Sequence, residues 1–206
     1  KIESRAGVNN IDEILAVSDG IMVARGDLGV EVPFEELPSI QKTIIHKCRV
    51  HGKRSITATE MLESMIKQPR PTRAEISDVA NAVYDGSSAI MLSGETAAGA
   101  YPVEAVKAMA RIAAQAEENT KYIAYIAPEE YHIKSLSEAL SHSACTLAQD
   151  IGAKLIVACT RSGYTAKLVS RFRPMIDIIG MTTDERAYRK LALSWGVIPV
   201  MSEEFY

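Results

Sequence analysis

Short apolar runs alternate with longer amphipathic segments along the whole chain. The runs of strand length fall at residues 20–24, 55–58, 89–92, 155–158, 176–180 and 197–201. Runs of this length, rich in aliphatic side chains, are typical of strands buried on both faces. Because segments of helical period separate them, the pattern predicts an α/β fold with parallel strands.

Apolar positions at the 3.6-residue period predict helices between these runs. The apolar side chains between Leu37 and Cys48 share one face, and Gly52 is placed to end that helix. Pro102 suits the first turn of another helix that continues to Asn119.

Two pairs of residues have the spacing of a helix capping box. Thr72 stands three residues before Glu75, and Ser135 stands three residues before Glu138. In such a box the hydroxyl and the carboxylate each accept a backbone N–H of the first turn. The pairs therefore predict two further helix starts.

The helical period fails between Lys121 and Lys134, where tyrosine, proline and charged residues gather. This stretch predicts a connector between two domains, residues 1–120 and 121–206. The chain starts at Lys1 with only a stub of apolar sequence, so we expect both ends to lie inside domains of a longer protein.

Composition excludes several classes of function. The 206 residues are 47% hydrophobic and 24% charged, as in soluble globular proteins, and carry a net charge of −3. That charge predicts neither a nucleic-acid nor a membrane partner. No apolar run approaches the roughly 20 residues of a membrane helix, and no leader precedes the first strand, so we expect a cytoplasmic protein. The three cysteines, far apart, are predicted to be reduced core residues.

Polar residues gather where the first predicted strands end. Lys1 and Glu3 are two positions apart, so on a strand both side chains project from the same face, and Asp27 follows the next strand. Ligands of parallel α/β proteins bind at this edge. Two carboxylates with room for water suit Mg²⁺ or Mn²⁺. On spacing alone, ordinary charged strand ends are the competing interpretation.

Glycines and a threonine stand beside these charges. Gly26 and Gly29 flank Asp27 in a segment that could turn sharply and present backbone N–H groups to a carboxylate or phosphate oxygen. A plain strand-to-loop exit is the alternative. Thr59, at the end of the following strand, could equally be a cap or a buried hydroxyl.

Five segments closely resemble the pyruvate kinase family, in its order and at its spacings. They are residues 1–3 (KIE), 22–29 (MVARGDLG), 61–65 (MLESM), 69–75 (PRPTRAE) and 91–97 (MLSGETA). The resemblance continues more loosely to the end of the chain. It implies a partial (β/α)8 TIM barrel containing the last strands and helices, followed by part of a parallel α/β C-terminal domain.

In that family the barrel transfers a phosphoryl group from phosphoenolpyruvate to ADP. The resemblance implies that Lys1 neutralises the phosphoryl group, that Glu3 and Asp27 hold Mg²⁺ or Mn²⁺, and that the backbone of Gly26 and Asp27 grips the substrate carboxylate. Thr59 matches the threonine beside the substrate, with a possible part in proton relay. These roles agree with a reaction catalysed by positioning and charge neutralisation.

The remaining matched residues have supporting roles. Ser93 and Glu95 match the polar end of the eighth barrel strand, and Arg25 is expected to hold loops or a neighbouring subunit. The family's K⁺ ligands and most nucleotide contacts lie outside this chain.

The second half resembles the domain that binds allosteric sugar phosphates in many members. The residues placed to form a phosphate site are Thr160, Arg161, Ser162, Gly163, Tyr164 and Thr165. A capped turn without a ligand is the alternative.

The expected parent protein is a glycolytic, homotetrameric pyruvate kinase, and the isolated chain is expected to be inactive. Two alternatives stay open. One is a non-catalytic regulatory or scaffolding fragment that binds a sugar phosphate. The other is a different pyruvate-utilising barrel enzyme, such as a metal-dependent aldolase, against which segments 61–65 and 69–75 argue.

Overall fold

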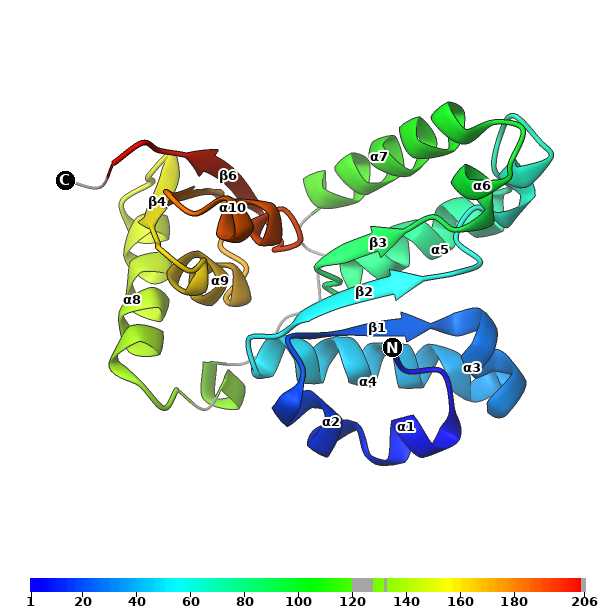
Figure 1. Cartoon of the computed structure of the whole chain (residues 1–206), viewed down its shortest axis with the longest axis horizontal. Coiled ribbons are helices and arrows are strands. Elements are labelled where there is room, and N and C mark those ends of the chain that lie inside the picture. The colour runs from blue at the N-terminus through cyan, green and yellow to red at the C-terminus, as the bar shows by residue number, and fades with distance from the viewer. Residues whose placement is uncertain (120–127, 132, 205–206) are drawn as a thin grey trace. The chain divides into compact units, whose positions relative to one another are not determined.

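The structure is a computed structural model that describes residues 1–119, 128–131 and 133–204 (Figure 1). The chain divides into two compact units. One comprises Lys1–Cys48 and Lys53–Ile126, and the other comprises Arg49–Gly52 and Ala127–Tyr206. The predicted connector, 121–134, lies mostly outside the described residues.

A parallel sheet with the order β1-β2-β3 forms the centre of the first unit. Its strands are β1 (Gly20–Ala24), β2 (Arg54–Ala58) and β3 (Ala89–Met91). Ile2 extends the sheet by a parallel bridge to Val23, with its N–H 2.8 Å from the Met22 carbonyl. The predicted α/β class and parallel strands are therefore confirmed, with each of these strands within a residue of its predicted bounds.

Helices separate these strands and cover the sheet. The elements outside the strands are α1 (Arg5–Asn9), α2 (Ile11–Val17), α3 (Arg25–Glu31), η1 (Phe34–Glu36), α4 (Leu37–Val50), η2 (Glu63–Ile66), α5 (Arg73–Tyr84), α6 (Gly94–Ala97) and α7 (Pro102–Glu118). Helix α3 was not predicted. It begins immediately after β1 and occupies the segment expected to be a glycine-bearing turn.

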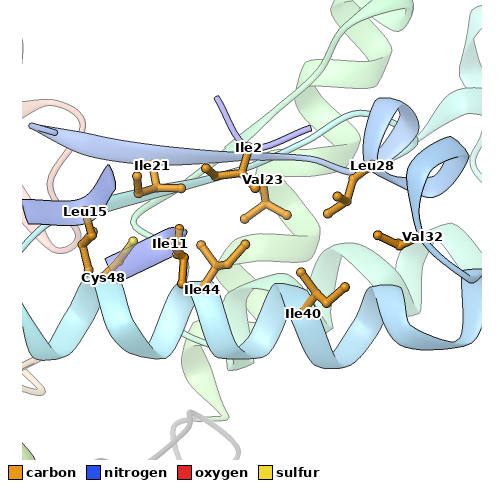
Figure 2. Close-up of a cluster of buried hydrophobic side chains, with 10 residues drawn as sticks. All are labelled: Ile2, Ile11, Leu15, Ile21, Val23, Leu28, Val32, Ile40, Ile44 and Cys48. Atoms are coloured by element: carbon orange, nitrogen blue, oxygen red, sulfur yellow. The ribbon is translucent and has the colours of Figure 1, made fainter. Parts of the chain in front are cut away.

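One apolar layer fixes β1 against α4. Figure 2 shows Ile21 and Val23 of β1 facing Ile40 and Ile44 of α4, with Ile2 packed in the same layer. All five side chains are at most 8% exposed. Burying an aliphatic side chain of this size contributes about 1.5–3 kcal/mol. This packing holds the start of the chain and β1 in register.

The predicted capping box at the start of α5 is present. The Thr72 hydroxyl accepts the Glu75 N–H at 3.3 Å, and the Glu75 carboxylate accepts the Thr72 N–H at 2.7 Å. Glu75 also accepts two hydrogen bonds from Ser64. Burial raises the pKa of Glu75, but these hydrogen bonds outweigh it and hold that pKa below its usual value. The box thus anchors the loop after β2 as well as the helix.

Replacing Thr72 by alanine is expected to destabilise the chain by about 1 kcal/mol, because an N-cap acceptor is lost. Urea unfolding followed by circular dichroism measures the change. Thr43→Ala is the matched control, since the Thr43 hydroxyl donates to the Ser39 carbonyl on the surface of α4 and caps no helix. Equal stability of the Thr72 and Thr43 variants would contradict the role of the box.

The second unit contains its own parallel sheet, with the order β4-β5-β6. Its elements are η4 (Pro128–Tyr131), α8 (Leu136–Asp150), β4 (Leu155–Cys159), α9 (Tyr164–Arg171), β5 (Asp177–Thr182), α10 (Glu185–Leu191) and β6 (Val197–Met201). Its core contains at least one buried side chain from each of the three strands, packed with side chains of α8, α9 and α10.

Two sequence expectations need correction in this unit. The predicted helix start is confirmed, since Ser135 caps α8 by accepting the Glu138 N–H, but the Glu138 carboxylate accepts the Lys134 N–H and pairs with Arg171, so the capping box is incomplete. Cys145 is buried, which raises the pKa of its thiol to about 12, whereas Cys159 is exposed and is not a core residue. Among the described residues, no helix is long and apolar enough to cross a membrane.

Candidate functional site

Three charged side chains meet at the carboxyl ends of the first strands. The Lys1 ammonium lies 2.5 Å from a Glu3 carboxylate oxygen and 2.9 Å from an Asp27 carboxylate oxygen. Ile2 is only 2% exposed and points into the core, so Lys1 and Glu3 project from the opposite face. Asp27 comes from the first turn of α3. The structure therefore brings these three predicted residues together.

The cluster is open to solvent, and Lys1 forms ion pairs with both carboxylates. Each of the three side chains is about half exposed. Hydrogen bonds from Lys1 to Glu3 and to Asp27 raise the pKa of Lys1 above its usual value. The hydrogen bond from Lys1, reinforced by its positive charge, lowers the pKa of Asp27 below 3.8. The ammonium and the Asp27 carboxylate are thus both charged at neutral pH.

Replacing Lys1 by methionine is expected to raise the pKa of Asp27 towards 3.8. Because the pKa is lowered in the folded state, the ion pair stabilises that state above pH 3.8, and this contribution is lost as the pH falls through the folded-state pKa. Carboxyl ¹³C NMR titration of both proteins measures the shift. An identical Asp27 titration in the two proteins would contradict the coupling.

Thr59 lies on the neighbouring strand end and contacts α3 directly. Its hydroxyl accepts the Gly26 N–H at 2.8 Å and lies 2.6 Å from the Ala58 carbonyl, to which it donates. Thr59 and Glu60 both adopt left-handed backbone angles, with φ of 68° and 54°. The Gly26 N–H is therefore engaged by Thr59 and is not the open anion-binding donor that the sequence suggested.

Arg25 is buried beneath this turn. The sequence predicted only that it holds loops or a neighbouring subunit. Its side chain is 7% exposed and its Nη1 lies 2.7 Å from the Asp78 carboxylate. Its Nε and Nη2 donate to the Thr59 carbonyl at 3.1 and 2.7 Å, and Nη2 also donates to the Glu60 carbonyl at 3.0 Å. Sequence reasoning did not identify Asp78, which stands far from the strand ends in sequence.

Glu95 connects the loops after β2 and β3. The residue is fully buried, and its carboxylate accepts the Leu62 N–H at 2.9 Å and the Ser93 N–H at 2.7 Å. Buried carboxylates are tolerated when such bonds satisfy them. Ser93 and Glu95, which follow β3, thus fix the loops around the strand ends.

The Glu3 and Asp27 carboxylates fit a hard divalent cation. They are oxygen ligands, they converge on one point now held by the Lys1 ammonium, and they are accessible to water. The site offers two carboxylates, and nowhere in the described part of the chain do three or more histidine, cysteine, aspartate or glutamate side chains converge. Two carboxylates with waters and substrate oxygens match the usual Mg²⁺ environment.

The predicted phosphate segment forms the turn between β4 and α9. Thr160 is buried and donates its N–H to the Met181 carbonyl, while Arg161 and Ser162 are exposed. Gly163 adopts a left-handed φ of 83° immediately before Tyr164 starts α9. The segment therefore presents a helix N-terminus with polar side chains beside it.

Comparison with known proteins assigns both halves of the chain. Residues 1–106 match the family described as pyruvate kinase, barrel domain, and residues 138–205 match pyruvate kinase, alpha/beta domain. The chain is 53% identical over all its residues to a pyruvate kinase of Clostridium acetobutylicum, of which it covers 44%. It is 51% identical to that of Lactobacillus delbrueckii subsp. bulgaricus, over 99% of this chain and 35% of the relative.

A solved structure gives the same result. A crystal structure of a pyruvate kinase from Cryptosporidium parvum matches with a TM-score of 0.90 and 46% identity, over 98% of this chain and 42% of that one. The chain thus spans less than half the length of these relatives. From the two matched domains and the parallel sheets that carry them, we conclude that the chain belongs to the pyruvate kinase family and represents part of its fold.

Proposed function

We propose that the protein containing this chain transfers the phosphoryl group of phosphoenolpyruvate to ADP. The P–O bond of the donor breaks, a terminal ADP oxygen forms the new bond, and the electron pair left behind gives the enolate of pyruvate, which then takes a proton at carbon. The observation that carries the proposal is the meeting of Lys1, Glu3 and Asp27 at the carboxyl ends of adjacent parallel strands.

In this proposal the Lys1 ammonium contacts the phosphoryl oxygens as the group moves. Its raised pKa keeps it protonated at neutral pH, so it can offset the negative charge of the transferring group. Glu3 and Asp27 hold Mg²⁺ or Mn²⁺, which when bound supplies positive charge to the phosphoryl and enolate oxygens. If Glu3 and Asp27 bound the metal, Lys1 would lose its ion pairs with them and could contact the substrate.

Thr59 and the first turn of α3 hold the organic part of the substrate. The Thr59 hydroxyl accepts the Gly26 N–H at 2.8 Å and now donates its one proton to the Ala58 carbonyl; with substrate bound, that proton would turn from the carbonyl to the substrate carboxylate. Asp27 supplies a helix N-terminal N–H for the same group, where the helix dipole favours an anion. Ser93 and Glu95 support the loops and do not contact the reacting atoms.

The isolated chain is proposed to be inactive, because the K⁺ ligands and most nucleotide contacts of the family lie outside it. The decisive test is a hybrid enzyme in which this chain replaces the matching segment of the Clostridium acetobutylicum relative, to which it is 53% identical. Lactate dehydrogenase coupled to pyruvate formation measures turnover. We expect an active hybrid and an inactive isolated chain; an inactive hybrid that is folded would refute the proposal.

A second candidate function, sugar-phosphate binding, rests on the turn before α9. Gly163 in the left-handed conformation allows the polar residues 160–165 to surround a helix N-terminus, which favours phosphate. Titration of the chain with fructose 1,6-bisphosphate or ribose 5-phosphate, followed by Trp195 fluorescence, tests it. Saturable change lost in Ser162→Ala supports this function, and no change for either ligand refutes it.

The wider setting follows from the same proposal. A pyruvate kinase works in glycolysis in the cytoplasm, requires K⁺ in addition to the divalent cation, and assembles as a homotetramer. Analytical ultracentrifugation of the hybrid enzyme tests the oligomeric state.

A further inference from the structure

We infer that Arg25 is a positioning residue that holds the Thr59–Glu60 turn in its left-handed conformation and thereby places the Thr59 hydroxyl. The inference rests on the proposed function for its kinetic consequence, but its structural part stands on contacts within the first unit. Arg25 does not touch the Lys1, Glu3 and Asp27 cluster through any described hydrogen bond.

The guanidinium donates hydrogen bonds to backbone carbonyls of the turn and not to the side chains of Thr59 and Glu60. Nε and Nη2 both point at the Thr59 carbonyl, at 3.1 and 2.7 Å, and Nη2 reaches the Glu60 carbonyl at 3.0 Å. The planar fork of arginine donates several bonds in a fixed geometry, which the single ammonium of lysine does not reproduce. Two successive carbonyls are thus held from one side chain.

The turn needs such support because neither of its residues is glycine. Thr59 and Glu60 have φ of 68° and 54°, where side chains with a Cβ are disfavoured. Backbone in this region persists only when surrounding structure over-determines it. The carbonyls of these two residues are the groups that Arg25 binds, so removing the guanidinium is expected to release the turn.

The turn is linked to the site by a second hydrogen bond from the same strand end. Arg25 is followed by Gly26, whose N–H donates to the Thr59 hydroxyl at 2.8 Å. The side chain of one residue and the backbone of the next therefore attach to the same turn. Asp78 of α5, 2.7 Å from Nη1, balances the charge of the buried guanidinium and orients it.

Hydrogen exchange in the isolated chain tests the structural part. In the unmodified chain the Arg25 Nε–H should exchange slowly, because it is buried and bonded to the Thr59 carbonyl. In Arg25→Lys the Gly26 amide should exchange at least tenfold faster, while amides of β4–β6 keep their rates. Arg5→Lys is the matched control, since Arg5 pairs with Glu36 in a more exposed ion pair.

Kinetics of the hybrid enzyme test the functional part. Arg25→Lys is expected to lower kcat/KM for phosphoenolpyruvate about 10- to 100-fold, the effect of a small misplacement of a substrate-contacting group, with KM for ADP unchanged. Adding Glu60→Gly to the Arg25→Lys variant should recover at least a third of the loss in log(kcat/KM) for phosphoenolpyruvate. The reason is that glycine adopts positive φ without strain. A merely structural role for Arg25 gives no such rescue.

The outcomes separate the two claims. Fast exchange of the Arg25 Nε–H in the unmodified chain, or unchanged exchange of Gly26 in Arg25→Lys, overturns the inference whatever the activity of the hybrid. Unchanged kcat/KM in a folded Arg25→Lys hybrid, or failure of Glu60→Gly to restore it, overturns the kinetic part. An inactive unmodified hybrid refutes the proposed function and leaves the exchange result to decide the inference.

Discussion

Replacing Lys1 by methionine in the hybrid enzyme is expected to lower kcat by about 10³-fold or more. A cation that offsets charge on a transferring phosphoryl group is worth about 10³–10⁵ in rate. Methionine keeps the length and apolar stem of lysine but removes the charge. The lactate-dehydrogenase-coupled assay at saturating phosphoenolpyruvate, ADP and Mg²⁺ measures the loss.

The same variant should not weaken binding of the divalent cation. Lys1 now lies between the Glu3 and Asp27 oxygens, at 2.5 and 2.9 Å, so its removal leaves both carboxylates free for the metal. Lys42→Met, which breaks an ion pair with Asp85 away from the strand ends, is the control and should retain activity. A Lys1→Met hybrid within threefold of the unmodified kcat would exclude the proposed role.

Removing either carboxylate is expected to raise the Mg²⁺ concentration for half-maximal activity at least 10- to 100-fold. Loss of even an outer partner of a metal ligand costs about that factor, and Glu3→Gln or Asp27→Asn removes a charged ligand itself. Both substitutions keep side-chain size. Activity of the hybrid is followed as a function of Mg²⁺, and again with Mn²⁺.

The control for these variants is Glu36→Gln, which removes a carboxylate of similar exposure that pairs with Arg5. Its Mg²⁺ requirement should match that of the unmodified hybrid. If Glu3→Gln and Asp27→Asn also leave the Mg²⁺ requirement unchanged, the assignment of these residues to the metal is wrong.

Much of the fold could be predicted from hydrophobic pattern and capping. The apolar runs 20–24 and 197–201 coincide with β1 and β6, and the Thr72–Glu75 spacing marks the start of α5. These signals are local, since a strand or a cap is determined by neighbouring side chains. The proximity of Lys1, Glu3 and Asp27 followed from a general rule, that carboxyl ends of parallel strands share one edge.

The rest depends on contacts between distant segments. Helix α3 was missed because Gly26 and Gly29 are poor helix formers, and its burial through Leu28 overrides that preference. The left-handed turn at Thr59 contains no glycine that would predict it, and the Thr59 carbonyl accepts a hydrogen bond from Arg25, 34 residues earlier. The incomplete box at Ser135 arises because Glu138 pairs with Arg171 instead.

Paramagnetic NMR of the isolated chain with Mn²⁺ tests whether Glu3 and Asp27 bind the metal, because it needs neither the hybrid enzyme nor a substrate. We expect substoichiometric Mn²⁺ to broaden amide signals around Glu3, Asp27 and Thr59 first, and Asp27→Asn to abolish this selectivity. Broadening centred on other acidic residues, with the signals around Glu3 and Asp27 unaffected, would contradict it.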